Sequence, residues 1–190
     1  MFRSTARSSW LIVALALAGC DQSAGGGPDG GLDAGPRRQG SSPTGPLVIN
    51  EVAPRPADGA DWLELVNRSD QTVELCDYFV TDSIDRLDHY LLLGPAIYPD
   101  RCQSRPLAPG DYLVVVADGD PDAGPDHAPF QLGVADEAHV IGRDGLVVDS
   151  FIYLYPQDGD GRSLARSPDG EGLFFLAEPT PGAANPELQP

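Results

Sequence analysis

The chain has 190 residues, of which 22 are Gly and 19 are Pro, and its 29 Asp plus Glu face only 12 Arg and no Lys. The formal net charge of −17 argues against nucleic acid and anionic lipid as primary partners, because like charges repel. The Gly and Pro content disfavours long helices, and three Cys are too few for a disulfide-rich scaffold or for a zinc site built from four cysteines.

Residues 1–19 have the pattern of a bacterial lipoprotein signal peptide. Two arginines precede a short apolar run, Trp10–Ala18, which is far shorter than the roughly 20 residues of a membrane-spanning helix. The run leads into Leu17–Cys20 (LAGC), which resembles the lipobox and implies cleavage before Cys20 and lipidation of its thiol. Two or three acyl chains would anchor the protein stably to the cell envelope. The alternative is an ordinary signal peptide with an incidental Cys, and the sequence leaves the membrane leaflet open.

Residues 20–46 comprise the lipidated Cys20 and a tether rich in Gly and Pro. Asp21–Pro46 contains eight Gly, four Pro and no aromatic residue. Such a segment buries too little apolar surface to offset the entropy of ordering, so we expect a disordered linker. As a flexible coil it would span about 30 Å and hold the following domain off the membrane.

From residue 47 the chain changes to short β-prone runs separated by turn residues. No segment keeps its apolar residues on one face of a helix for more than two turns. Arg143–Gly145 is expected to form the tight turn of a β-hairpin. The pattern predicts an all-β fold, an antiparallel β-sandwich over residues 47–186, followed by a tail at 187–190. The expected strands are Leu47–Val52, Asp61–Asn67, Thr72–Leu75, Tyr78–Thr81, Tyr112–Ala117, Ala138–Gly142, Leu146–Tyr153, Arg162–Arg166 and Leu173–Leu176.

The order of several short motifs also resembles the lamin tail domain family. These motifs are Val48–Val52, Asp61–Asn67, Val73–Leu75, Tyr78–Asp82, Leu107–Val115, Gly145–Ser150, Gly161–Arg166, Pro168–Gly170 and Glu178–Asn185. The resemblance implies an immunoglobulin-like β-sandwich, which occurs in nuclear lamins and as a module of secreted bacterial proteins. The chain departs from the family at Tyr78, where Trp is usual, and in the long stretch Ile84–Arg105, whose strand pairing stays open.

Three residues of the first two expected strands are candidates for a structural or catalytic role. Trp62 is expected to anchor the core, and strand alternation places it and its neighbour Leu63 on opposite faces without deciding which face is the inner one. Glu51 and Glu64 could act as a pair of carboxylates in acid–base chemistry. We prefer a role in capping Arg or backbone groups at the rim of the sandwich.

Cys76 and Cys102 remain once Cys20 is assigned to the anchor. In an oxidising envelope compartment, such a remaining pair predicts a disulfide. The bond would stabilise the fold by about 3.5 kcal/mol in the chain-entropy description. It would also fasten the long stretch after Tyr78 to the end of an early strand.

Four aspartates at alternate positions form a candidate Ca²⁺ loop. Oxygen ligands spaced in this way can surround a Ca²⁺ ion, as at the start of an EF-hand loop. However, Ala123 stands where the turn Gly belongs, Pro121 stiffens the loop and no Glu stands at the twelfth position. A solvated acidic loop is the alternative that we favour. The four residues are Asp118, Asp120, Asp122 and Asp126.

Other candidate sites are weaker. Phe151, Tyr153 and Tyr155 alternate, so they share one face of a strand, where they could form either a carbohydrate platform or, as we prefer, part of the core. His139 lies in an expected strand and is interpreted as a packed or edge residue. The sequence contains no nucleophile elbow, P-loop or dinucleotide-binding fingerprint.

Together these features predict a lipid-anchored cell-envelope protein with a non-catalytic, lamin-tail-like binding or adhesion module. Its expected partners are the membrane, through Cys20, and an envelope protein or a glycan, but not nucleic acid. No cofactor is expected unless the acidic loop binds Ca²⁺. Two alternatives stay open: an accessory unit of a secreted hydrolase or nuclease system, and a carbohydrate-binding β-sandwich.

Overall fold

The computed structural model describes residues 43, 45–98, 101–157, 159 and 161–188. The predicted signal peptide, the lipidation site Cys20 and all of the tether except residues 43, 45 and 46 lie outside these residues. The chain separates into two units, 1–33 and 34–190, and the described residues all belong to the second. The described part of the chain contains no helix that could span a lipid bilayer.

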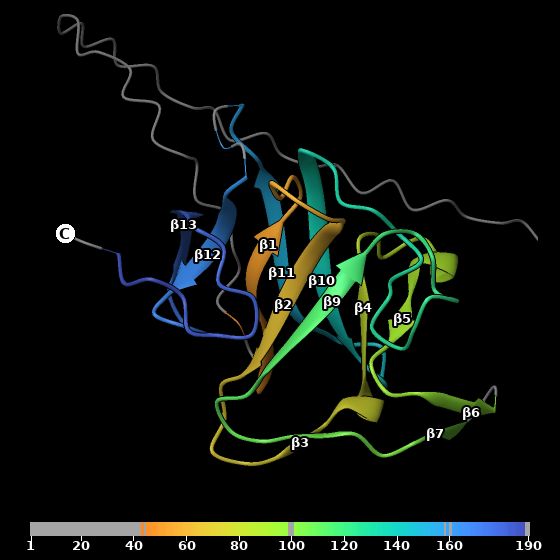
Figure 1. The fold of residues 1–190 in the computed structure, drawn as a ribbon. Coiled ribbons are helices and arrows are strands. Elements are labelled where there is room, and N and C mark those ends of the chain that lie inside the picture. Colours follow the sequence, from red (N-terminus) through yellow and green to blue (C-terminus); the bar gives the residue numbers. More distant parts are fainter. Residues whose placement is uncertain (1–42, 44, 99–100, 158, 160, 189–190) are drawn as a thin grey trace, which may run out of the picture. The chain divides into compact units, whose positions relative to one another are not determined.

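Two antiparallel sheets pack face to face as a β-sandwich (Figure 1). The larger sheet has the strand order β13-β12-β1-β2-β9, and the smaller has the order β11-β10-β4-β5. This arrangement confirms the predicted all-β, immunoglobulin-like fold class. The strands of these sheets are β1 (Leu47–Ala53), β2 (Asp61–Asn67), β4 (Tyr78–Thr81), β5 (Leu91–Leu92), β9 (Tyr112–Ala117), β10 (Ala135–Gly142), β11 (Val147–Leu154), β12 (Ser163–Ser167) and β13 (Leu173–Ala177).

The burial pattern of each strand follows from what covers its two faces. Residues of β9 alternate between half-buried and buried, as expected where one face meets the core. All residues of β1 are buried, because the smaller sheet covers one face and the C-terminal segment covers the other. Backbone N–H groups of Thr180 and Gly182 in that segment donate to the side chains of Glu51 and Glu64.

The hydrophobic core lies between the two sheets. Leu63 and Leu65 of β2 are fully buried in it, together with residues of both sheets such as Ile49, Val80 and Val115. Trp62 is only 9% exposed, but it is not part of this core cluster. Trp62 is thus buried, as predicted, but on the face of β2 opposite the cluster between the sheets, because alternation along β2 gives that inner face to the two leucines.

The elements expected from the sequence are present, although some ends differ. The strand expected at Thr72–Leu75 is only β3 (Val73–Glu74), because Leu75–Asp77 form a 3₁₀ turn, η1. The Glu74 side chain accepts a hydrogen bond from the backbone of Cys76 and so starts this turn. The β10–β11 hairpin confirms the predicted turn, with Gly145 N donating to Gly142 O at 2.8 Å.

The long stretch between β4 and β8 (Pro106–Leu107) is fastened by a disulfide. Cys76 and Cys102 are bonded with their Cα atoms 5.7 Å apart, which confirms the predicted pair. The stretch contains η2 (Leu87–His89), β5, which pairs with β4, and a hairpin of β6 (Ala96–Tyr98) and β7 (Arg101–Cys102), while β8 pairs with β3. Gly94 passes directly against the bond, since a Cβ there would lie 2.1 Å from the Cys102 Sγ atom.

β1 contains an extra residue, and the part of the strand before Glu51 has no neighbour on the β12 side. β1 and β2 pair through Ile49 and then, after a register shift, through Glu51, so Asn50 is the extra residue. β12 pairs with β1 only from Glu51 onward. Side chains bind the backbone of Ile49 instead. Arg166 Nε donates to the Ile49 backbone oxygen at 2.9 Å, and the Ile49 backbone N–H donates to Asp149 Oδ2 at 2.9 Å.

Arg166 and Asp149 also bind each other across the sandwich. Arg166 Nη2 of β12 donates to Asp149 Oδ2 of β11 at 3.0 Å, and both side chains are buried. Arg166 Nη1 donates to the backbone oxygen of Gly172 at 3.1 Å, and the guanidinium lies 4.3 Å from the centre of the Phe174 ring. A single arginine thus joins the two sheets and the β12–β13 turn.

We predict that Arg166→Ala lowers the free energy of unfolding by about 3–5 kcal/mol, because it leaves the Asp149 carboxylate buried without a cation. Urea unfolding of the purified protein, followed by tryptophan fluorescence, measures this loss. Arg86→Ala is the matched control, since Arg86 pairs with Asp88 at the surface and its removal should cost less than about 1 kcal/mol. Equal losses in the two variants would contradict the prediction.

Candidate functional site

Glu51 and Glu64 form a buried carboxylate pair on neighbouring strands. They are direct partners in the β1–β2 register, and neither is exposed. Glu51 accepts hydrogen bonds from the backbone N–H and the hydroxyl of Thr180, each at 3.1 Å. Glu64 accepts from Gly182 N at 2.6 Å and from Asn50 Nδ2 at 3.1 Å. The pair therefore caps backbone groups, as we preferred, but it does so beneath the C-terminal segment, on the outer face of the larger sheet, and not at the rim.

The environment of this pair favours the protonated carboxyl. Burial raises the pKa of Glu64 to about 7 from an ordinary 4.5, although its hydrogen bonds from Asn50 and Gly182 act in the opposite direction. Burial also raises the pKa of Glu51. The folded protein holds these protons more tightly than the unfolded chain does. The contribution of Glu64 to stability is therefore complete below about pH 4.5 and is lost as the pH rises through about 7, and that of Glu51 is lost in the same direction.

We predict that the free energy of unfolding falls as the pH rises from 5 to 8, with Glu64 contributing on the order of 3 kcal/mol to the fall. Glu64→Gln cannot titrate and should make the pH dependence clearly shallower. Denaturant unfolding at several pH values measures both slopes. The exposed residue Glu178 supplies the control, since Glu178→Gln should keep the slope of the unaltered protein. An identical slope in Glu64→Gln would refute the assignment.

The acidic loop after β9 does not bring its four aspartates together around one point. The four are Asp118, Asp120, Asp122 and Asp126. Asp118 Oδ1 accepts the backbone N–H of Asp120 at 3.0 Å, and its Oδ2 lies 2.6 Å from His127 Nδ1. Asp126 binds the guanidinium of Arg105 through both oxygens, one of them at 3.0 Å. Among the described residues, no group of three or more His, Cys, Asp or Glu side chains is placed to hold a metal ion.

We therefore expect the melting temperature to be the same in EDTA and in millimolar Ca²⁺. Asp118 and Asp126 already bind His127 and Arg105, and Ca²⁺ would have to displace these partners. Thermal melts across a Ca²⁺ titration test the Ca²⁺ site, which stays a sequence-based prediction. A saturable rise in melting temperature that Asp120→Ala abolishes would contradict our expectation, since binding to the folded state must stabilise it.

The alternating aromatic residues of the β11 region face the core. Phe151, Tyr153 and Tyr155 are all buried and belong to the core cluster, which agrees with the interpretation that we preferred. They therefore offer no exposed platform for a sugar ring. His139 is packed as expected, with Nδ1 2.5 Å from the hydroxyl of Ser150.

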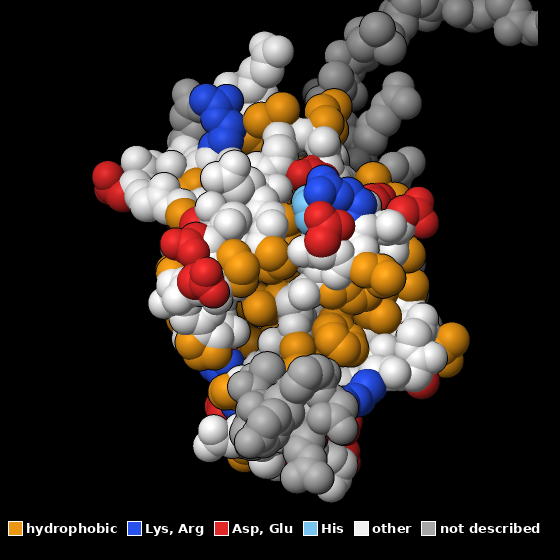
Figure 2. Space-filling model, turned by 90° about the vertical axis from the view of Figure 1, so that its right-hand side faces the viewer, with side chains coloured by type: hydrophobic (Ala, Val, Ile, Leu, Met, Phe, Trp, Pro, Cys, Tyr) orange, Lys and Arg blue, Asp and Glu red, His pale blue; other side chains and the backbone are white. Residues whose placement is uncertain are grey.

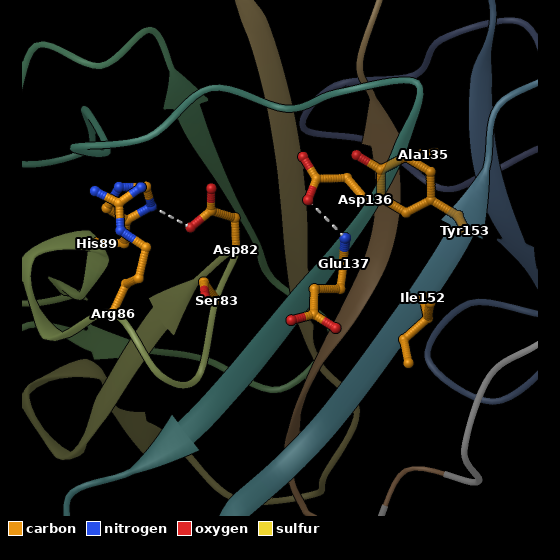
Figure 3. A pocket seen from close by; sticks show the side chains of 9 residues that line it. All are labelled: Asp82, Ser83, Arg86, His89, Ala135, Asp136, Glu137, Ile152 and Tyr153. Carbon is orange, nitrogen blue, oxygen red and sulfur yellow. Dashed lines mark hydrogen bonds and ion pairs between the residues drawn. The ribbon is translucent and has the colours of Figure 1, made fainter.

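A surface pocket of about 490 Å³ lies between η2 and the β10–β11 hairpin. Figure 2 views the molecule from the side of β4 and β5, where hydrophobic side chains gather across the middle and charged ones lie above them. Figure 3 shows one wall of the pocket, formed by Asp82, Ser83, Arg86 and His89. Charges on this wall are already paired: Asp82 Oδ1 lies 2.6 Å from His89 Nδ1, and Arg86 donates to Asp88 at 2.9 Å.

The opposite wall of the pocket is acidic and is built by two paired strands. Asp136 and Glu137 of β10 stand opposite Tyr153 and Ile152 of β11 in the ladder. Asp136 accepts backbone N–H groups on both oxygens, from Gly133 at 2.7 Å and from Glu137 at 2.9 Å. These bonds fix the position of the carboxylate at the mouth of the pocket.

Tyr153 is the unusual residue of this wall. It is only 7% exposed, and its hydroxyl is buried without a hydrogen-bond partner. Its ring extends from β11 toward the side where Asp136 lies (Figure 3). Burial raises the pKa of Tyr153, and the charges of Asp136, Asp61 and Asp82 raise it further, so the hydroxyl keeps its proton. A neutral hydroxyl thus faces a field of negative charge.

The sequence did not predict this pocket. Asp82, His89, Asp136 and Tyr153 are far apart along the chain, and no spacing rule connects them. Alternation did single out Tyr153, but only as a core residue. Its second role depends on the pairing of β10 with β11 and on the position of η2.

Comparison with known proteins agrees with the fold. A family model described as the lamin tail domain matches residues 40–170, which is more than half of the chain. A search of curated proteins finds no match to the chain. The matched range contains both cysteines of the disulfide, the acidic loop and every residue of the pocket. The chain belongs to the lamin tail domain family, whose members are non-catalytic, immunoglobulin-like domains.

Proposed function

We propose that this protein is anchored to the cell envelope by lipid on Cys20 and presents its lamin tail domain as a non-catalytic binding or adhesion module. The observation that carries the proposal is the order of three parts along the chain. A lipobox-like sequence ends at Cys20, a Gly- and Pro-rich segment follows, and a lamin tail domain begins near residue 40.

The properties of the domain support a role in binding. Its family is non-catalytic, and immunoglobulin-like sandwiches commonly serve to bind other molecules. A net charge of −17 repels nucleic acid and favours neutral or cationic partners. The domain also offers a pocket of about 490 Å³ with one acidic wall, where a small part of a partner can be held.

Replacement of Cys20 tests the anchor. In Cys20→Ala cells we expect the protein to move from the membrane fraction to the soluble fraction, because no thiol remains to carry acyl chains. Mass spectrometry of the N-terminal peptide should show acylated Cys20 in the unaltered protein. Gln22→Ala, two residues further on, is the control and should stay with the membrane. A Cys20→Ala protein that remains in the membrane fraction would overturn the proposal.

A further inference from the structure

We propose that the pocket between η2 and the β10–β11 hairpin binds the primary ammonium group of a lysine side chain on a partner protein. The ammonium would lie against Asp136 and the hydroxyl of Tyr153. This inference rests on the proposed function, because it names the chemistry that a binding module of this shape would recognise.

The buried hydroxyl of Tyr153 points to a ligand. A hydroxyl has one donor and two acceptor positions, and buried hydroxyls nearly always have a partner. The Tyr153 hydroxyl has none, although its residue is more than nine-tenths buried and lines the pocket. A group that enters the pocket and donates a hydrogen bond would satisfy it.

The charges around this hydroxyl select a cation. Asp136 lies on the same wall, and its charge and those of Asp61 and Asp82 act on the Tyr153 hydroxyl. Glu137 also lines the pocket, with Oε1 3.3 Å from His139 Nε2. On the other wall, His89 Nδ1 lies 2.6 Å from Asp82, and Arg86 donates to Asp88 at 2.9 Å. The field at the hydroxyl is therefore negative, which repels an anion and attracts a cation.

The arrangement fits an ammonium better than a guanidinium. A guanidinium binds best to a carboxylate with two free oxygens, but both oxygens of Asp136 already accept backbone N–H groups. An ammonium is a compact charge with three separate donors, and it needs only one acceptor from each group that it meets. Asp136 and the Tyr153 hydroxyl can each supply one, since their residues are direct partners in the β10–β11 ladder and share a face.

The ammonium would come from another molecule, because this chain contains no Lys. Its net charge of −17 would also draw a basic protein segment toward the domain. Exposed Ile152, at the edge of the pocket, can contact the aliphatic part of a lysine side chain.

The test is a titration of the purified full chain with the peptide acetyl-Gly-Lys-Gly-amide, followed by NMR. We expect saturable shifts of the amide signals of Glu137, Ile152 and Tyr153, which weaken as salt is added. The same peptide with an acetylated lysine side chain has lost its charge and should cause no shift. Shifts of equal size with the acetylated peptide would overturn the inference. Tighter binding of 1,5-diaminopentane than of the peptide would assign the pocket to a free amine and overturn the lysine partner.

Two variants identify the binding groups. Tyr153→Phe removes only the hydroxyl, so we expect about three- to tenfold weaker binding with an unchanged or higher melting temperature. Glu137→Gln removes a half-exposed negative charge of the pocket lining, so it should weaken binding through the electrostatic field alone and by less than Tyr153→Phe does. Glu178→Gln removes one charge from the end of the larger sheet and is the control for net charge. Unaltered affinity in both pocket variants would refute the site, as would a lower melting temperature for Tyr153→Phe, because the hydroxyl would then have a partner in the free protein.

This outcome is independent of the anchor experiment. If the lysine peptide fails to bind while Cys20→Ala still releases the protein from the membrane, the pocket inference falls and the proposed function stands. If Cys20→Ala leaves the protein in the membrane, the proposed function falls regardless of how the peptide behaves.

Discussion

The extra residue Asn50 in β1 is the constraint on which the rest of the structure depends. At this residue the register of β1 against β2 shifts, and the backbone of Ile49, just before it, has no strand neighbour on the β12 side. Buried backbone groups need partners, so side chains of Arg166 and Asp149 supply them. Because these residues belong to different sheets, a local irregularity in one strand fixes how the two sheets dock.

The same residue also binds the C-terminal part of the chain. The Asn50 side chain donates to Glu64 and accepts from Gly170 N, and its backbone oxygen accepts from Asn185. Polar groups thus lie on the outer face of the larger sheet, where only a segment with free N–H groups can cover them. The C-terminal segment does so through Thr180 and its neighbours. Covering the outer face in this way removes the two glutamates from water, and this burial raises their pKa values.

Polar groups of the buried glutamate pair and of the pocket differ in one respect. Glu51 and Glu64 have their acceptors filled by the chain itself, and they belong to the stability of the fold. The Tyr153 hydroxyl is equally buried but has no partner, although it stands in the same ladder as Asp136 and Glu137. A buried group that the chain satisfies is structural, whereas one that it leaves unsatisfied beside a pocket is a candidate for binding.

The sequence by itself determined what depends on neighbouring residues along the chain. Alternation and turn residues predicted the main strands and the β10–β11 hairpin, and the parity of the cysteines predicted the Cys76–Cys102 bond. Only the tertiary structure decided which face of β2 is the inner one, and so placed Leu63 and Leu65, but not Trp62, in the cluster between the sheets. Only the tertiary structure joined Arg166 to Asp149. The pocket likewise appears only after folding, because Asp82, Asp136 and Tyr153 meet through strand pairing and sheet packing. Periodicity fixes that two side chains face opposite ways, but long-range packing fixes what each of them meets.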